Sequence, residues 1–245
     1  MKIDAKGMNY RDLNERIHEA VSRGAREVDL VNVLGHRYIG TGVDKDVTIN
    51  IYGTPGSDLG AFMDGPTINV FGSAQDCVGN TMNGGTIAIH GDAGNVVGLS
   101  MRNGKLWIRG SVGYRVGIHM KAYQDKCPVI VVGGRAGDFL GEYMAGGKLI
   151  VLGVFKKDRD PVVGRYIGTG MHGGVIYIRG GVSKSQIGEG VELEEASQDD
   201  KEALRGDIQQ FCAQLKVQGL DEILSDTFVK LTPRSKRPYG KLYAY

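Results

Sequence analysis

Cysteine is scarce in this sequence, and its few copies are widely separated. Cys77, Cys127 and Cys212 are spread along 245 residues, whereas structural zinc and iron–sulfur sites use clustered cysteines. An odd number also argues against a disulfide framework. We therefore expect no metal-binding residues and no cofactor bound by this chain itself.

Long apolar runs and a charge imbalance are lacking as well. The sequence contains no run of about 18 apolar residues, and its N-terminal residues 1–6 do not resemble a signal peptide. We therefore expect a cytoplasmic protein with no membrane partner. The 30 Lys and Arg residues nearly balance 28 Asp and Glu residues. Since nucleic-acid-binding domains usually carry a strongly basic face, we expect no nucleic-acid partner.

Glycine is abundant instead, with 39 residues, and it recurs at a fixed spacing. Several short strand patterns end on glycines that are 19 residues apart, as at Gly53, Gly72 and Gly91. The full series of closing glycines is Gly35, Gly53, Gly72, Gly91, Gly110, Gly133, Gly153 and Gly180. A second glycine recurs inside the repeats, at Gly40, Gly60, Gly79, Gly98, Gly117, Gly141 and Gly168. Such phased repetition indicates a solenoid in which each repeat forms one coil.

The strand patterns alternate with a period of two residues, which favours strands over the helix of a leucine-rich repeat. Parallel crossovers are nearly always right-handed. We therefore predict a right-handed parallel β-helix of about seven coils over residues 31–182. Methionine marks the register of the coils, because six methionines each lie three residues after an internal glycine. We expect these six side chains to form one buried column. They are Met63, Met82, Met101, Met120, Met144 and Met171.

Both ends depart from the repeat. Residues 1–30 are predicted as a helical cap, with a helix over 9–23 that starts at Asn9. Residues 183–245 are predicted as a helical extension and a basic tail, with helices over 198–217 and 221–228. The acidic stretch 189–202 resembles a solvated linker. We expect the N-terminal helix to cap one end of the solenoid, and the C-terminal helices to cap the other end or contact a partner.

The basic, aromatic tail over residues 233–245 has two interpretations. It is either a disordered terminus or a docking element. In a docking element, Tyr239, Leu242 and Tyr243 would contact another subunit, while Arg234 and Arg237 face acidic groups. Under the second interpretation, removing residues 233–245 should leave the β-helix folded and weaken binding to its partner.

One hexapeptide, Arg-Tyr-Ile-Gly-Thr-Gly, occurs twice, at residues 37–42 and 165–170. Its glycine spacing resembles a dinucleotide fingerprint, but neither copy precedes a predicted helix, which that motif requires. We interpret the glycines as corner residues of the coil. The duplication leaves open that both copies face a common partner.

Other candidate chemistry is weaker. Asp58, Asp76 and Asp138 recur near internal glycines, which allows a β-helical enzyme that cleaves carbohydrates with paired carboxylates. The three residues lie at offsets of two, three and three from their glycines, so only some of them can stack. The histidines have no metal-ligand spacing, and the methionines suit core packing better than a soft metal.

The segment over residues 137–147, with Glu142-Tyr143-Met144-Ala145-Gly146-Gly147 and a following strand, carries a family resemblance. It resembles the GXGXG β-helix domain at the C-terminus of glutamate synthase large subunits, and the resemblance covers residues 31–182. It implies a free-standing form of that domain, which acts as a scaffold. The partners would be an amidotransferase subunit and a subunit that carries FMN and iron–sulfur clusters.

This resemblance implies no catalytic residue in the chain, which has no counterpart of the amidotransferase's N-terminal cysteine nucleophile. Activity of the chain alone is not expected, and self-association stays open. Related subunits occur in N-methylglutamate synthase and in formylmethanofuran dehydrogenase, so the resemblance leaves the identity of the complex open.

Overall fold

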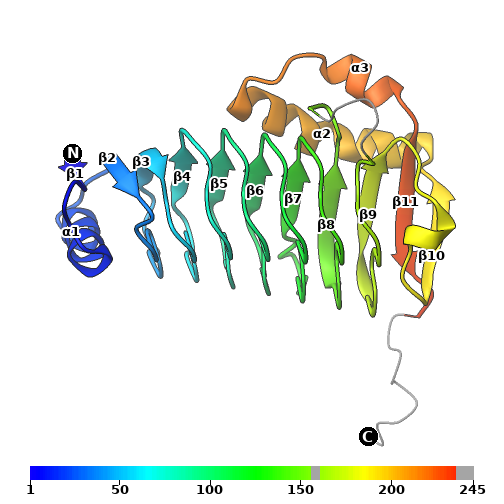
Figure 1. Cartoon of the computed structure of the whole chain (residues 1–245), viewed down its shortest axis with the longest axis horizontal. Coiled ribbons are helices and arrows are strands. Elements are labelled where there is room, and N and C mark those ends of the chain that lie inside the picture. Colours follow the sequence, from blue (N-terminus) through cyan, green and yellow to red (C-terminus); the bar gives the residue numbers. More distant parts are fainter. Residues whose placement is uncertain (156–160, 236–245) are drawn as a thin grey trace, which may run out of the picture.

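The computed structural model describes residues 1–155 and 161–235. Parallel strands stacked along one axis make up most of it (Figure 1). The elements are β1 (Lys2–Asp4), α1 (Tyr10–Ser22), β2 (Glu27–Leu34), β3 (Thr48–Thr54), β4 (Thr67–Val70), β5 (Thr86–Ile89), β6 (Lys105–Ile108), β7 (Val129–Val132), β8 (Ala145–Val151), β9 (Gly173–Arg179), η1 (Lys184–Gln186), β10 (Val191–Glu195), α2 (Gln198–Leu215), α3 (Leu220–Ser225) and β11 (Phe228–Pro233). Strands β1 to β9 pair in parallel in chain order. The predicted parallel β-helix is confirmed.

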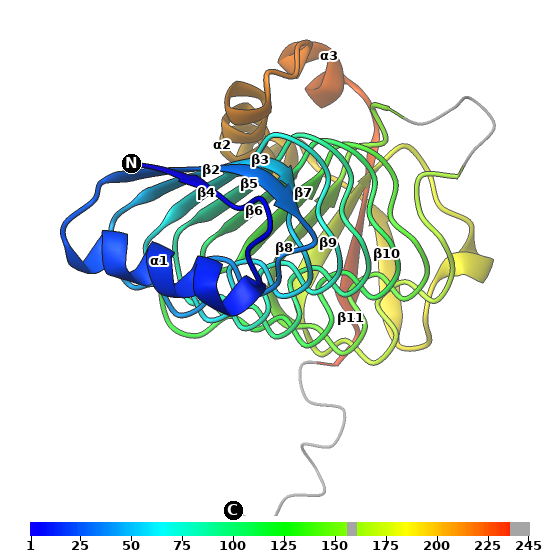
Figure 2. The ribbon, with the colours of Figure 1, turned by 60° about the vertical axis from the view of Figure 1, so that its left-hand side comes forward.

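Equivalent positions of successive coils stack, as the repeat predicts. Ile68 pairs with Ile49 on one side and with Ile87 on the other, and all three are fully buried. The six methionines form part of the same core and are buried, which confirms the register. Figure 2 shows the coils nearly end-on, with their interiors enclosed by the chain.

Away from the sheet, each coil turns through a double bend that explains the internal glycine. Three alternate residues have positive φ, for example Asp58, Gly60 and Phe62. Two overlapping turns follow, in which Ala61 N–H donates to Asp58 O and Met63 N–H donates to Gly60 O. Position 60 also has no room for a side chain, because a Cβ there would lie 2.5 Å from Ile87 Cδ1. The lack of space therefore requires glycine at position 60, and the positive φ favours it.

The N-terminal helix lies at one end of the solenoid (Figure 1). The Asn9 side chain accepts hydrogen bonds from the backbone N–H groups of Arg11 and Asp12, which is a strong N-cap. Leu13 and Ile17 are buried in the main core. The segment is not only helical, however, because β1 joins the sheet and β2 already begins at Glu27, inside the predicted cap.

The C-terminal region departs from the prediction. The stretch 189–202 is not a solvated linker, because it contains β10 and the first turn of α2. The short helix predicted over 221–228 is α3, which ends at Ser225, and Phe228 starts β11. Strand β11 pairs antiparallel with β9 and carries β10 on its far side, so strands rather than helices continue the sheet beyond the last coil. The helical pattern of 198–217 was the only clear periodic signal in this region, so the strand pair was not predicted.

Helix α2 lies along the outer face of the sheet and contacts β5, β6 and β7 (Figure 1). One position in each strand points out of the solenoid, and the side chains at this position explain where α2 packs. Asn50 and Asn69 occupy this position in β3 and β4, and are hydrogen-bonded to each other. The same position is apolar in the following strands, at Ala88, Trp107, Val131 and Ile150, with Tyr177 in β9. These residues form a second core with Phe211 and its neighbours on α2.

The C-terminal tail begins later than the predicted residue 233. Pro233 is the last residue of β11, and the Arg234 N–H donates to Gly190 O over 2.9 Å, so a truncation at 233 would disturb the sheet. Arg237, Tyr239, Leu242 and Tyr243 lie outside the described residues, and their docking role stays a prediction. Among the described residues, no helix is long and apolar enough to cross a membrane.

The buried methionine column gives a test of the register. Met101→Asp places a carboxylate in an apolar interior and should lower the free energy of unfolding by about 4 kcal/mol. Met101→Leu conserves volume and should cost less than about 1.5 kcal/mol. Denaturant titration followed by circular dichroism measures both. Equal midpoints for Met101→Asp and the wild type would contradict the buried column.

The attachment of α2 gives a second test, which depends on pH. The Tyr177 hydroxyl donates to Asp200 Oδ1 over 2.7 Å, and burial together with this carboxylate raises the pKa of Tyr177 well above its ordinary value of 10. The unfolded chain therefore loses this proton first, so stability should fall as the pH rises above about 10. Tyr177→Phe should flatten that fall, whereas Tyr114→Phe, at an exposed position, should not. Urea midpoints between pH 8 and pH 11 measure the difference.

Candidate interaction surface

The three aspartates proposed as candidate catalytic residues, Asp58, Asp76 and Asp138, form hydrogen bonds between coils. Asp76 Oδ1 accepts the N–H of Asn95 over 2.7 Å, and Asp138 Oδ1 accepts the N–H of Arg165 over 2.8 Å. Asp58 accepts the side-chain amide of Asn80 over 3.0 Å. Each carboxylate thus bonds to the following coil. The described residues contain no group of three or more His, Cys, Asp or Glu side chains that could hold a metal ion.

The cysteines are free in the part of the chain that the structure describes. Burial raises the pKa of the Cys77 thiol, and the nearby Asp58 and Asp76 raise it further. Burial likewise raises the pKa of Cys212, which lies on the buried face of α2. A thiol with a raised pKa is a poor nucleophile at neutral pH, so these two positions favour packing over catalysis.

The duplicated hexapeptide occupies the double bend of the first and last coils. Tyr38 and Tyr166 both have positive φ, as do the two glycines that follow each of them. Each copy leads into a strand, β3 or β9, and not into a helix. The glycines therefore serve corner geometry, as predicted, and both tyrosines are exposed on the same edge of the solenoid.

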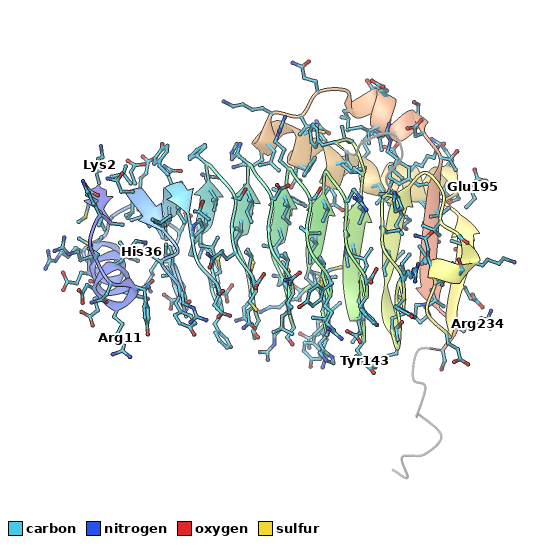
Figure 3. All side chains as sticks on the ribbon, viewed as in Figure 1. Lys2, Arg11, His36, Tyr143, Glu195 and Arg234 are labelled. Atoms are coloured by element: carbon cyan, nitrogen blue, oxygen red, sulfur yellow. The ribbon has the colours of Figure 1, made fainter. Side chains whose placement is uncertain are left out.

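Large exposed or half-buried side chains gather on this edge in the last three coils. We call them the turn-edge cluster: Tyr114, Arg115, His119, Phe139, Tyr143 and Tyr166. Their rings stack across coils, with 4.9 Å between the centroids of Phe139 and Tyr166 and 5.4 Å between those of His119 and Tyr143. Figure 3 labels Tyr143 at this edge, on the side away from α2.

A buried acid fixes the cation of the cluster. Arg115 Nε donates to Glu142 Oε2 over 2.8 Å, and Glu142 is only 8% exposed. The same guanidinium lies 4.8 Å from the ring centroid of Phe139 and 5.6 Å from that of Tyr114. An ion pair with a buried partner and two cation–π contacts hold Arg115 in one orientation.

The backbone of the cluster is strained. Arg115, His119, Phe139, Tyr143 and Tyr166 all have φ between 52° and 61°. The left-handed conformation costs a non-glycine residue about 1–2 kcal/mol. Earlier coils have the same conformation at equivalent positions, with the exposed aromatic residues Tyr38 and Phe62 in the first two coils and the smaller Thr81 and Ser100 in the next two. The strain is therefore a feature of the coil geometry that the cluster shares with the other coils.

A second aromatic column lies at the opposite end of the strands. Tyr52 stacks on Phe71 and Phe71 stacks on His90, each with 4.9 Å between centroids. Burial lowers the pKa of His90, and the nearby Lys216 and Arg109 lower it further. His90 is therefore neutral at physiological pH. Sequence reasoning missed this column, although Tyr52, Phe71 and His90 recur at the 19-residue spacing of the repeat.

Fold and surface together define a glycine-punctuated β-solenoid that presents ordered columns of side chains. The GXGXG motif family matches residues 16–234, and the chain belongs to this family. It is 53% identical to the uncharacterized protein MJ1350 of Methanocaldococcus jannaschii, over 98% of this chain and 95% of that protein.

The fold is also similar to that of a chain in the crystal structure of the formyltransferase/hydrolase complex (FhcABCD) from Methylorubrum extorquens in complex with methylofuran. The TM-score is 0.63 at 20% identity, and the similarity covers 92% of this chain and 88% of that chain. At this identity the comparison concerns the fold.

The strain in the cluster predicts an unusual response to glycine. Tyr143→Gly relieves the left-handed strain, and Gly42 and Gly170 already occupy the equivalent position in the first and last coils. The gain offsets the flexibility that glycine adds to the unfolded chain. The free energy of unfolding should therefore change by less than about 1 kcal/mol. Tyr143→Val, with a β-branched side chain that fits this conformation poorly, should destabilise the protein more in the same urea titration.

Proposed function

We propose that this protein is a non-catalytic assembly subunit of a multi-subunit enzyme complex. One observation carries the proposal: a chain of similar fold and extent is a component of the FhcABCD complex. Because this chain spans 88% of that component, the similarity extends along nearly the whole subunit. The stacked coils form a stiff rod, on which partner subunits would be held at fixed separations.

The FhcABCD similarity favours a formyltransferase/hydrolase-type complex related to formylmethanofuran chemistry as the first candidate. A glutamate synthase-type complex is the second candidate, and the segment Glu142–Gly147 favours it through its resemblance to the glutamate synthase β-helix domain. In that case glutamine hydrolysis and the FMN and iron–sulfur chemistry would belong to partner subunits. In both cases the chain contributes surfaces and spacing, and the reacting groups are on other chains.

Purification from the native organism tests this proposal. A tagged full-length chain should retain at least one other polypeptide in fixed stoichiometry, identifiable by mass spectrometry. A formyltransferase or hydrolase partner supports the first candidate, and a flavin and iron–sulfur protein supports the second.

The chain purified alone gives the complementary measurement. It should show no visible absorption from flavin or iron–sulfur clusters. Stoichiometric flavin in the isolated chain, or a wild-type chain purified without any stoichiometric partner, would overturn the assembly role.

A further inference from the structure

We propose that the turn-edge cluster is the docking surface for an acidic segment of a partner subunit. This inference rests on the proposed assembly role and specifies which surface performs it. Tyr114, Tyr143 and Tyr166 are between 45% and 50% exposed, although each is a large aromatic side chain. Exposed, contiguous rings of this kind are typical of protein–protein contact sites.

The cluster is preorganised for binding. The cross-coil stacks of Phe139 on Tyr166 and of His119 on Tyr143 fix the rings relative to the solenoid. The Tyr143 ring also packs against Gly170, where a Cβ would lie 2.4 Å from Tyr143 Cε1. Rings held in this way lose little conformational freedom when a partner covers them.

Charge along the edge identifies the chemistry of the partner. At the position four residues after the internal glycine, the first two coils carry Asp44 and Asp64, whereas the fourth and fifth carry Arg102 and Lys121. All four side chains are exposed. The edge is therefore acidic at the N-terminal end and basic beside the cluster. A partner with acidic side chains would be attracted to the basic part and repelled by the acidic part, which fixes its register.

Two acids within the cluster region have partners. Glu142 pairs with Arg115, and Asp138 accepts the N–H of Arg165. Asp125 has Lys126 as its neighbour in the insertion after the fifth coil. The cations of Lys121 and Arg165 consequently dominate the exposed charge around the rings.

Site-specific crosslinking tests the proposal in the assembled complex. A photoreactive benzoyl-phenylalanine replaces Tyr166 in the tagged full-length chain, and Tyr52 in a matched control, since Tyr52 is similarly exposed at the other corner. After purification from the native organism and illumination, the crosslinked peptides are sequenced by mass spectrometry. We expect the position-166 probe to label a segment rich in Asp and Glu on a stoichiometric partner, and the position-52 probe not to label that segment.

Charge reversal gives the second arm. The double variant Lys121→Glu with Arg165→Glu should weaken binding of that partner on the order of tenfold or more, with an unchanged melting temperature. The matched control Arg26→Glu reverses an exposed cation near the other end of the solenoid and should leave the affinity unchanged. Biolayer interferometry at two salt concentrations measures both, and the wild-type affinity should fall as salt rises.

The outcomes separate this inference from the assembly role. A stoichiometric partner that crosslinks elsewhere and binds the charge-reversed variant normally overturns the docking surface alone. Crosslinks to a second copy of the chain, or to RNA, also overturn it. Absence of any stoichiometric partner overturns the docking surface and the assembly role together.

Discussion

Hydrogen bonds between equivalent positions of successive coils are the interaction on which the rest of the structure depends. The N–H of Gly60 donates to Ile39 O over 2.8 Å, and Gly79 and Gly98 donate in the same way to Leu59 and Val78. The bond forms only if each coil bends at the same residue, which requires left-handed backbone there. Glycine therefore recurs at the same position of each coil, and each side chain lies next to the side chain at the equivalent position of the adjacent coil. Buried columns and exposed columns both follow from this constraint.

This regularity decides what the other segments do. A stack of coils has open ends and an exposed sheet face, both of which must be covered. Helix α1 covers the first end, while β11 and β10 continue the sheet at the other. Helix α2 covers the sheet where the outward ladder is apolar, as at Trp107 and Ile150. The bend edge has no such cover among the described residues, and there the aromatic rings of the last coils are exposed.

The repeat was predictable from sequence because its signals are local and periodic. Glycine and methionine spacing gave the fold, the register and the buried column around Met101. The C-terminal strand pair was not, because β11 joins the sheet through long-range antiparallel pairing without a repeat of its own. The turn-edge cluster was missed because its residues differ in type from coil to coil. Only the shared backbone conformation of Arg115, Phe139 and Tyr166 unites them.

We propose that this solenoid acts through its surface within a larger assembly. The most direct measurement is an electron cryomicroscopy structure of the complex purified from the native organism. The account predicts that the edge containing Tyr143 and Tyr166 is buried against acidic side chains of another subunit, with the reacting groups on other chains. An exposed edge, or substrate bound among residues of this chain, would contradict it.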